Sequence, residues 1–210
     1  MLKVGVVLLL CVGSSLAVNQ QLFLIDNNAN NETIESTISI SGYIQDLADL
    51  NFDKRASTAC VVSGLWLLYS NRNFNTDSIL GNAVHFVYGD NVCSGSTFIV
   101  DEISSVRYAG SFVDWKANSM NLYGKDWYQG REQFLVGDAY TVLLGNVRSL
   151  IVSGTSPWIV FDEESFAGNG VCIRPFAPEF GQPGMYPNIE AAIKSAKIST
   201  EEECQLYPQF

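Results

Sequence analysis

The chain has 210 residues, of which 47% are hydrophobic, 12% aromatic and only 16% charged. This composition is typical of a folded protein with a buried core and excludes an intrinsically disordered chain. Twelve basic residues against 22 acidic ones give a formal net charge of −10. No basic face is then available for the phosphates of a nucleic acid or for an anionic membrane surface, so we expect neither as a partner.

The first 17 residues have the pattern of a secretory signal peptide. Lys3 precedes an apolar run from Val4 to Val12, and Ser15 and Ala17 are the small residues that a signal peptidase requires. A membrane anchor is the alternative, but the run is shorter than the roughly 20 residues that span a bilayer, and we expect no membrane insertion. We therefore predict a secreted, extracellular protein, in which Asn31 begins a sequon for N-linked glycosylation.

Four cysteines follow the predicted signal peptide: Cys60, Cys93, Cys172 and Cys204. An even number of cysteines in a secreted chain predicts two disulfides, and three pairings are open at this stage. Pairing of Cys60 with Cys93 and of Cys172 with Cys204 is favoured if the chain has two domains. A zinc site is the alternative, but the sequence contains no Cys-x-x-Cys pair and its one histidine is His85.

Short β-type runs separated by turn residues recur along the chain, and an all-β fold is expected, with one helix-compatible run at 188–197. Three segments share a pattern of aromatic, four residues, aromatic, one residue, glycine. They are Tyr69–Phe74 with Thr76 in the glycine position, Tyr123–Tyr128 with Gly130, and Phe161–Phe166 with Gly168. Strand-like segments opened by a serine accompany them, at Ser57, Ser105, Ser149 and Ser195. Four serines indicate four repeats.

The spacing of the repeats divides the chain into two halves. The distance from serine to the next first aromatic is 12 residues from Ser57, 18 from Ser105 and 12 from Ser149. A long middle junction is expected for two pairs of repeats joined by a linker. We predict a first domain at 18–110, a linker at 111–114, a second domain at 115–198 and an acidic, cysteine-containing tail at 199–210.

At these residues the chain resembles the βγ-crystallin superfamily, whose domains are β-sandwiches of two Greek-key motifs. Trp115 before Tyr123 and Trp158 before Phe161 look like the strand openings of that family. The resemblance implies that the paired aromatics cover a folded hairpin, that the glycine takes a positive φ, and that the serine hydroxyl satisfies backbone groups of the hairpin. The expected fold class is all-β, with two βγ-crystallin-like Greek-key β-sandwich domains. The first repeat is the least regular, since only Phe23 or Leu24 can open it.

The resemblance also implies calcium binding, through two adjacent Asp or Asn residues, two variable residues and two hydroxyl residues. In the first domain, 53–58 (Asp-Lys-Arg-Ala-Ser-Thr) keeps the first acid, and 100–105 (Val-Asp-Glu-Ile-Ser-Ser) keeps the second. The candidate ligands are therefore Asp53, Ser57, Asp101 and Ser104. Binding is expected to be weak because each motif lacks one carboxylate. The second domain has Arg148 in a hydroxyl position and is expected not to bind calcium.

Enzymatic chemistry has little support in the sequence. His85 lies in an alternating strand pattern, and there is no phosphate loop, dinucleotide fingerprint or Gly-x-Ser-x-Gly motif. The carboxylate pair Asp162 and Glu164 lies in one short hairpin, with nothing to desolvate it as a glycosidase would need.

We therefore predict no catalytic residues and no required cofactor, with calcium as the one candidate ion. The leading hypothesis is a secreted non-enzymatic protein with a structural or interaction role, whose partner is an extracellular protein or matrix component. The alternative is a secreted effector on the same scaffold, a protease inhibitor or a toxin-like defence protein. Such an effector would act through the loops at 27–31 and 175–187.

Overall fold

The computed structural model describes residues 19–27, 36–77, 83–94 and 101–210. The predicted signal peptide and Asn31 lie outside the described residues. The strands of the described segments are β1 (Gln21–Asp26), β2 (Ser36–Ile40), β3 (Thr58–Tyr69), β4 (Val84–Ser94), β5 (Ser105–Ala109), β6 (Ser119–Lys125), β7 (Gln129–Leu135), β8 (Ser149–Ser153), β9 (Trp158–Phe161), β10 (Gly170–Ile173), β11 (Gly184–Tyr186) and β12 (Ser195–Ile198). The described segments also contain four short 3₁₀ turns and one helical turn: η1 (Leu47–Leu50), η2 (Asn73–Asn75), η3 (Glu164–Phe166), η4 (Pro178–Phe180) and α1 (Glu201–Cys204).

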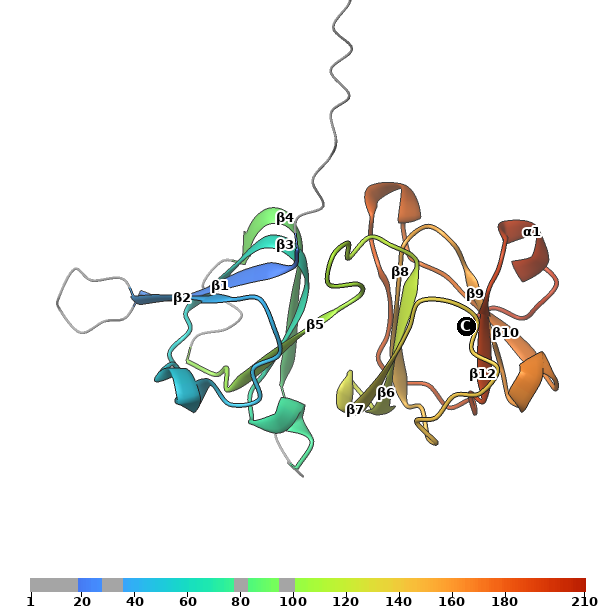
Figure 1. Ribbon diagram of the computed structural model, residues 1–210, viewed down its shortest axis with the longest axis horizontal. Helices are drawn as coiled ribbons and strands as arrows, with labels where there is room; N and C mark the ends of the chain where they lie inside the picture. Colours follow the sequence, from blue (N-terminus) through green and yellow to red (C-terminus); the bar gives the residue numbers. More distant parts are fainter. Residues whose placement is uncertain (1–18, 28–35, 78–82, 95–100) are drawn as a thin grey trace, which may run out of the picture.

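The structure is an all-β protein of two sandwiches that lie side by side, which confirms the expected fold class (Figure 1). Within the described part of the chain, no helix is long and apolar enough to cross a bilayer.

The N-terminal domain is one five-stranded sheet built around a long hairpin. The first half of β3 pairs with β1, its second half pairs with β5, and β4 runs antiparallel to β3 along almost its whole length. The hairpin bends where Gly64 (φ +132°) faces Gly89 (φ +134°). A Cβ atom at Gly64 would lie 2.4 Å from the buried Gln20 side chain, so only glycine fits there. The hairpin thus carries the chain from the half of the sandwich that contains β1 and β2 to the half that contains β5.

The core of the N-terminal domain follows from period-two alternation in the strands. β1 buries every second residue, and Leu22 and Leu24 point into the same cluster as Val61 and Trp66. Trp66 is fully buried and packs edge-on against Tyr108 at a centroid distance of 5.7 Å.

The C-terminal domain has the sheets β11-β8-β6-β7 and β10-β9-β12, and its core surrounds the fully buried Trp158. The run at 188–197 is not a helix, and that expectation was wrong. Ile189 and Ile193 are buried in the core, and the backbone N–H groups of Ile189 and Lys194 donate to carbonyls of other strands and loops, at Arg148 and Phe161. These contacts hold the run in an extended path that leads into β12.

Two disulfides link the cysteines in the pairing that the two-domain hypothesis favoured. Cys60 and Cys93 face each other across β3 and β4, with their Cα atoms 4.0 Å apart. Cys172 of β10 is bonded to Cys204 of α1, at a Cα separation of 5.4 Å. The second disulfide ties the C-terminal tail to the sandwich, and Thr200 caps α1 by accepting a hydrogen bond from the N–H of Glu203.

Each of three folded hairpins is anchored by the serine of its repeat. The Ser105 hydroxyl accepts from the N–H of Phe74 (3.0 Å) and donates to the carbonyl of Asn71 (2.6 Å). The Ser149 hydroxyl accepts from Tyr128 and donates to Lys125, and the Ser195 hydroxyl accepts from Phe166 and donates to Glu163. The backbone of the second aromatic is left-handed in all three hairpins, at Phe74, Tyr128 and Phe166. The hydroxyl satisfies polar groups that this sharp reversal leaves unpaired.

The glycine of the repeat takes the positive φ where it is present. Gly130 has φ +77° and Gly168 has φ +75°. Thr76, which stands in the same place in the second repeat, has φ −61°, and the positive φ is taken by Asn75 (φ +58°), one residue before it. The second repeat therefore reaches the same fold by moving the reversal one residue earlier in the chain.

The two domains are joined by a third apolar cluster, in which β3 and β5 face β6 and β8. Leu65, Leu67 and Tyr69 of the first domain pack with Tyr123 and Ile151 of the second.

A polar contact flanks this cluster. Asp90 of β4 accepts hydrogen bonds from Lys116 (2.6 Å) and Trp115 (3.2 Å), which lie between the two domains, and from Ser63. Partial burial raises the pKa of Asp90, but these hydrogen bonds outweigh it and hold the pKa below its usual value.

Candidate functional site

The two calcium motifs of the N-terminal domain lie next to each other. Lys54 and Asp101 occupy the same place in their motifs, and both have φ +53°. The N–H of Lys54 donates to Ile103 (2.8 Å), and the N–H of Asp101 donates to Ala56 (3.0 Å). The two loops are thus related by reciprocal backbone hydrogen bonds, with equivalent positions in the same backbone conformation.

The backbone of the two loops has the paired arrangement of a calcium site, but the side chains supply few free oxygen ligands. Asp53 has a buried carboxylate oxygen, Oδ1, with no hydrogen-bond partner among the described residues. Asp101 is exposed, and Ser104 is buried. The Ser57 hydroxyl is already engaged, because it accepts from Asn27 and donates to Ile25. Calcium takes six to eight oxygen ligands.

Acidic ligands are therefore scarce. The described residues contain no group of three or more His, Cys, Asp or Glu side chains that could hold a metal ion. The site offers two carboxylates, and Lys54 stands where the first motif would supply another. The set fits a weakly held ion, with backbone carbonyls and water completing the coordination.

The corresponding loop of the C-terminal domain is closed by an ion pair. Arg148 takes the hydroxyl position of the motif, and its Nε donates to Asp126 at 2.9 Å. A guanidinium at this point would repel a cation, and that this domain does not bind calcium stays a prediction.

The carboxylate pair and the histidine considered for catalysis have structural contacts. Asp162 accepts two hydrogen bonds from Asn169, which lower its pKa and close the turn before β10. Glu164 lies in η3, and the His85 ring on β4 lies 3.6 Å from the Glu102 carboxylate.

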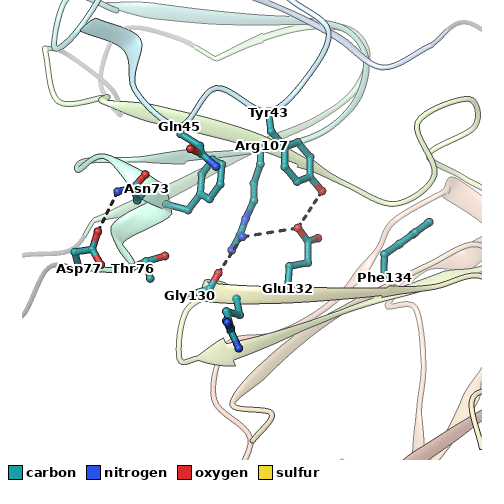
Figure 2. Close-up of a pocket in the computed structure, with 11 residues that line it drawn as sticks. Tyr43, Gln45, Asn73, Thr76, Asp77, Arg107, Gly130, Glu132 and Phe134 are labelled. Atoms are coloured by element: carbon teal, nitrogen blue, oxygen red, sulfur yellow. Dashed lines mark hydrogen bonds and ion pairs between the residues drawn. The ribbon is translucent and has the colours of Figure 1, made fainter. Parts of the chain in front are cut away.

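A cleft between the two domains was not foreseen from the sequence. It has a volume of about 630 Å³. One wall comes from the segment before η1 and from η2, the other from β7, and the side chain of Arg107 enters it between them (Figure 2).

Arg107 lies at the base of this cleft and is 2% exposed. Its Nε donates to the Tyr69 hydroxyl (2.8 Å), and its Nη2 and Nη1 donate to the carbonyls of Tyr128 (2.6 Å) and Gly130 (3.1 Å) in the other domain. The guanidinium carbon also lies 4.6 Å from the ring centroid of Tyr123. Burial lowers the pKa of Arg107, but the surrounding tyrosines and Glu132 raise it above its ordinary value, so this buried arginine is charged.

Glu132 on β7 balances that charge. Its carboxylate lies 3.7 Å from Arg107 Nη1 and accepts hydrogen bonds from the Tyr43 hydroxyl and the Asn121 amide. Burial, followed by the charge of Glu132, raises the pKa of Tyr43, so the phenol is protonated and acts as a donor. Every nitrogen of the guanidinium and both oxygens of the carboxylate make a hydrogen bond, which a buried charge pair needs to persist.

No protein-family model matches the sequence. Among solved structures, geodin, a βγ-crystallin from Geodia cydonium, matches with a TM-score of 0.66 and 18% identity, covering 87% of this chain and all of geodin. The chain has the βγ-crystallin fold. This finding confirms the resemblance noted in the sequence, since the βγ-crystallin match extends over both domains.

Two further βγ-crystallin proteins match smaller shares. Human beta/gamma crystallin domain-containing protein 1 is 23% identical over 163 residues, which are 74% of this chain. The chain spans 7% of the length of that relative. The fifth crystallin domain of the non-lens protein Absent in melanoma 1 is 22% identical, covers 40% of this chain and 90% of that domain, and has a TM-score of 0.34.

Proposed function

We propose that the chain is a secreted, non-enzymatic βγ-crystallin-like protein with a structural or interaction role. The observation that carries the proposal is the buried contact between the domains, in which Arg107 of the first binds Tyr128, Gly130 and Glu132 of the second. This contact joins the two disulfide-bonded sandwiches into one rigid body, and its buried charges hold the two domains together. Such a body suits long persistence in an extracellular fluid, matrix or coat, with an extracellular protein or matrix component as its partner.

The experiment is to produce the full chain in a secretory cell line and to follow both its location and its unfolding. We expect the protein in the medium, with two disulfides and with a glycan that the Asn31→Gln variant lacks. We expect one unfolding transition in urea, with tryptophan fluorescence and far-UV circular dichroism coinciding. Retention of the chain inside the cell would refute the secreted role, and two separate transitions would refute the single body.

Calcium binding by the N-terminal domain is a second proposal, supported by the buried, unpartnered Oδ1 of Asp53. A carboxylate oxygen buried without a donor is costly, and a bound cation would offset that cost. The reciprocal backbone hydrogen bonds between Lys54 and Asp101 and the opposite loop already bring the two motifs together. One ion would be held between Asp53 and Asp101, and none in the C-terminal domain.

Calorimetric titration of the oxidised protein with calcium tests this proposal, together with thermal unfolding in calcium and in chelator. A ligand at 100 times its dissociation constant stabilises the folded state by about 2.7 kcal/mol. We expect one weak site, a higher Tm in calcium, and loss of both in Asp53→Asn. Asp49→Asn, an exposed acid on η1, is the matched control and should bind as the parent does. No heat and no shift in Tm would refute the site.

A further inference from the structure

The cleft between the domains combines two exposed aromatic rings with planar polar side chains. Tyr43 and Phe134 line it and are each 42% exposed. Figure 2 shows Gln45, Asn73 and Asp77 on the side of the cleft away from Phe134, with Arg107 and Glu132 between. Amide and carboxylate groups can each make paired hydrogen bonds, and an aromatic face packs against flat apolar surface. The cleft therefore offers both kinds of contact to one ligand.

The charges in the cleft balance. Arg107 and Glu132 neutralise each other at its base. Arg131 and Asp77 add one charge of each sign to the lining. With two charges of each sign in its lining, the cleft has no net charge to attract a strongly charged anion or cation. A purely apolar ligand would cover the amide and carboxylate groups without giving them partners, which is unfavourable. A neutral ligand with many hydroxyl groups fits the cleft in both respects.

Three of the binding side chains, those of Tyr43, Asn73 and Asp77, are held in place before any ligand arrives. The N–H of Asn73 donates to the carbonyl of Gln45 (2.9 Å), and its side-chain amide donates to Asp77 (3.0 Å). The Tyr43 hydroxyl donates to Glu132 (2.9 Å), and its ring packs edge-on against Tyr108 at 4.7 Å. Side chains fixed in this way lose little conformational freedom on binding, so the cleft is organised for recognition.

We propose that this cleft is a binding site for a neutral oligosaccharide of two or three sugar units. The exposed rings of Tyr43 and Phe134 carry a negative partial charge on their faces and would pack against the C–H faces of the pyranose rings. Gln45, Asn73 and Asp77 would donate to and accept from adjacent sugar hydroxyls. The volume of about 630 Å³ lies in the range of small-molecule sites. The site is formed by both domains, so it exists only when they are paired, and it requires no calcium.

The test uses the full mature chain in buffer with chelator, so that its result is independent of the calcium proposal. Maltotriose, cellotriose, mannotriose and N-acetylchitotriose are titrated separately, with amide shifts recorded by NMR and heats by calorimetry. We expect at least one trisaccharide to bind saturably and to shift the amides of η2 and β7. The same trisaccharide is also attached to albumin through its reducing end. Binding of this conjugate would show that the ligand is the end of a glycan chain, and its failure to bind would show that the cleft accepts only the free sugar.

Substitutions at exposed positions test binding without disturbing the fold. Phe134→Ala and Gln45→Ala remove exposed side chains of the cleft and should each weaken binding about tenfold or more, because each deletes a contact worth about that factor. Phe180→Ala removes an aromatic that is 82% exposed and lies outside the lining, so it should bind as the parent does. The proposal is overturned if no trisaccharide binds, if both cleft variants bind normally, or if inorganic phosphate shifts the cleft amides at lower concentration than any sugar.

Discussion

The strongest test of the domain contact is to remove the Arg107 charge while keeping a side chain of similar length. Arg107→Met deletes hydrogen bonds to the Tyr69 hydroxyl and to the carbonyls of Tyr128 and Gly130, and it leaves Glu132, 11% exposed, without its cation. Breaking a buried charge pair from one side costs about 3–5 kcal/mol. Since Tyr43 and Asn121 still donate to Glu132, we expect the lower half of that range.

Differential scanning calorimetry measures the effect. A loss of about 3 kcal/mol lowers Tm by about 6–12 °C in a chain of this size. Arg131→Met is the matched control, because Arg131 is an exposed arginine on the same cleft, and its loss should change stability by less than about 0.5 kcal/mol.

A double variant isolates the charge pair. Arg107→Met with Glu132→Gln should be less unstable than the sum of the two single variants, since the uncompensated charge is gone. If Arg107→Met costs no more than Arg131→Met, the buried pair does not stabilise the domain contact and the reasoning is wrong.

Three further predictions concern other contacts. Hydrogen-bond donors lower the pKa of Asp90 in the folded state, so its contribution to stability is complete above the unfolded pKa of about 3.9 and is lost as the pH falls through the folded value. In urea unfolding between pH 2 and 6, Asp90→Asn should therefore lose less stability below about pH 4 than the parent does. Ser149→Ala leaves the buried N–H of Tyr128 without an acceptor and should cost about 1–3 kcal/mol, against less than about 0.5 kcal/mol for the exposed Thr155→Ala, and an equal cost for the two would refute the anchoring role. Reduction of the disulfide between β10 and α1 should cost about 2–5 kcal/mol in the same assay, and no change in stability on its selective removal would contradict this.

The sequence predicted those features that recur locally. Ser105, Ser149 and Ser195 each hydrogen bond to a hairpin whose two aromatics are five residues apart, so each hairpin leaves the same local pattern in the chain. The motifs around Asp53 and Asp101 were recognisable for the same reason, because a loop of one conformation requires residues at fixed offsets.

Long-range and irregular features left no such signal. Arg107 and Glu132 lie 25 residues apart in different domains, and an isolated arginine in a strand is ordinarily solvent exposed. The one available indication was that Arg107 stands among apolar and small residues in β5, where a charge needs a buried partner. The run at 188–197 misled because Ile189 and Ile193 are four residues apart, as on one face of a helix, whereas both reach the same core cluster from an extended loop.

The hairpin of β3 and β4 has a consequence for how the N-terminal domain assembles. Since β3 and β4 run through the whole of the one five-stranded sheet, its two halves cannot separate without breaking this hairpin, and the domain cannot be divided into two independent Greek keys. In the C-terminal domain the two halves of β3 correspond to two separate strands, β8 and β9, which belong to different sheets. A cut or an insertion between those two strands should be tolerated far better than one at Gly64, which makes the C-terminal half the natural place to open the chain for circular permutation.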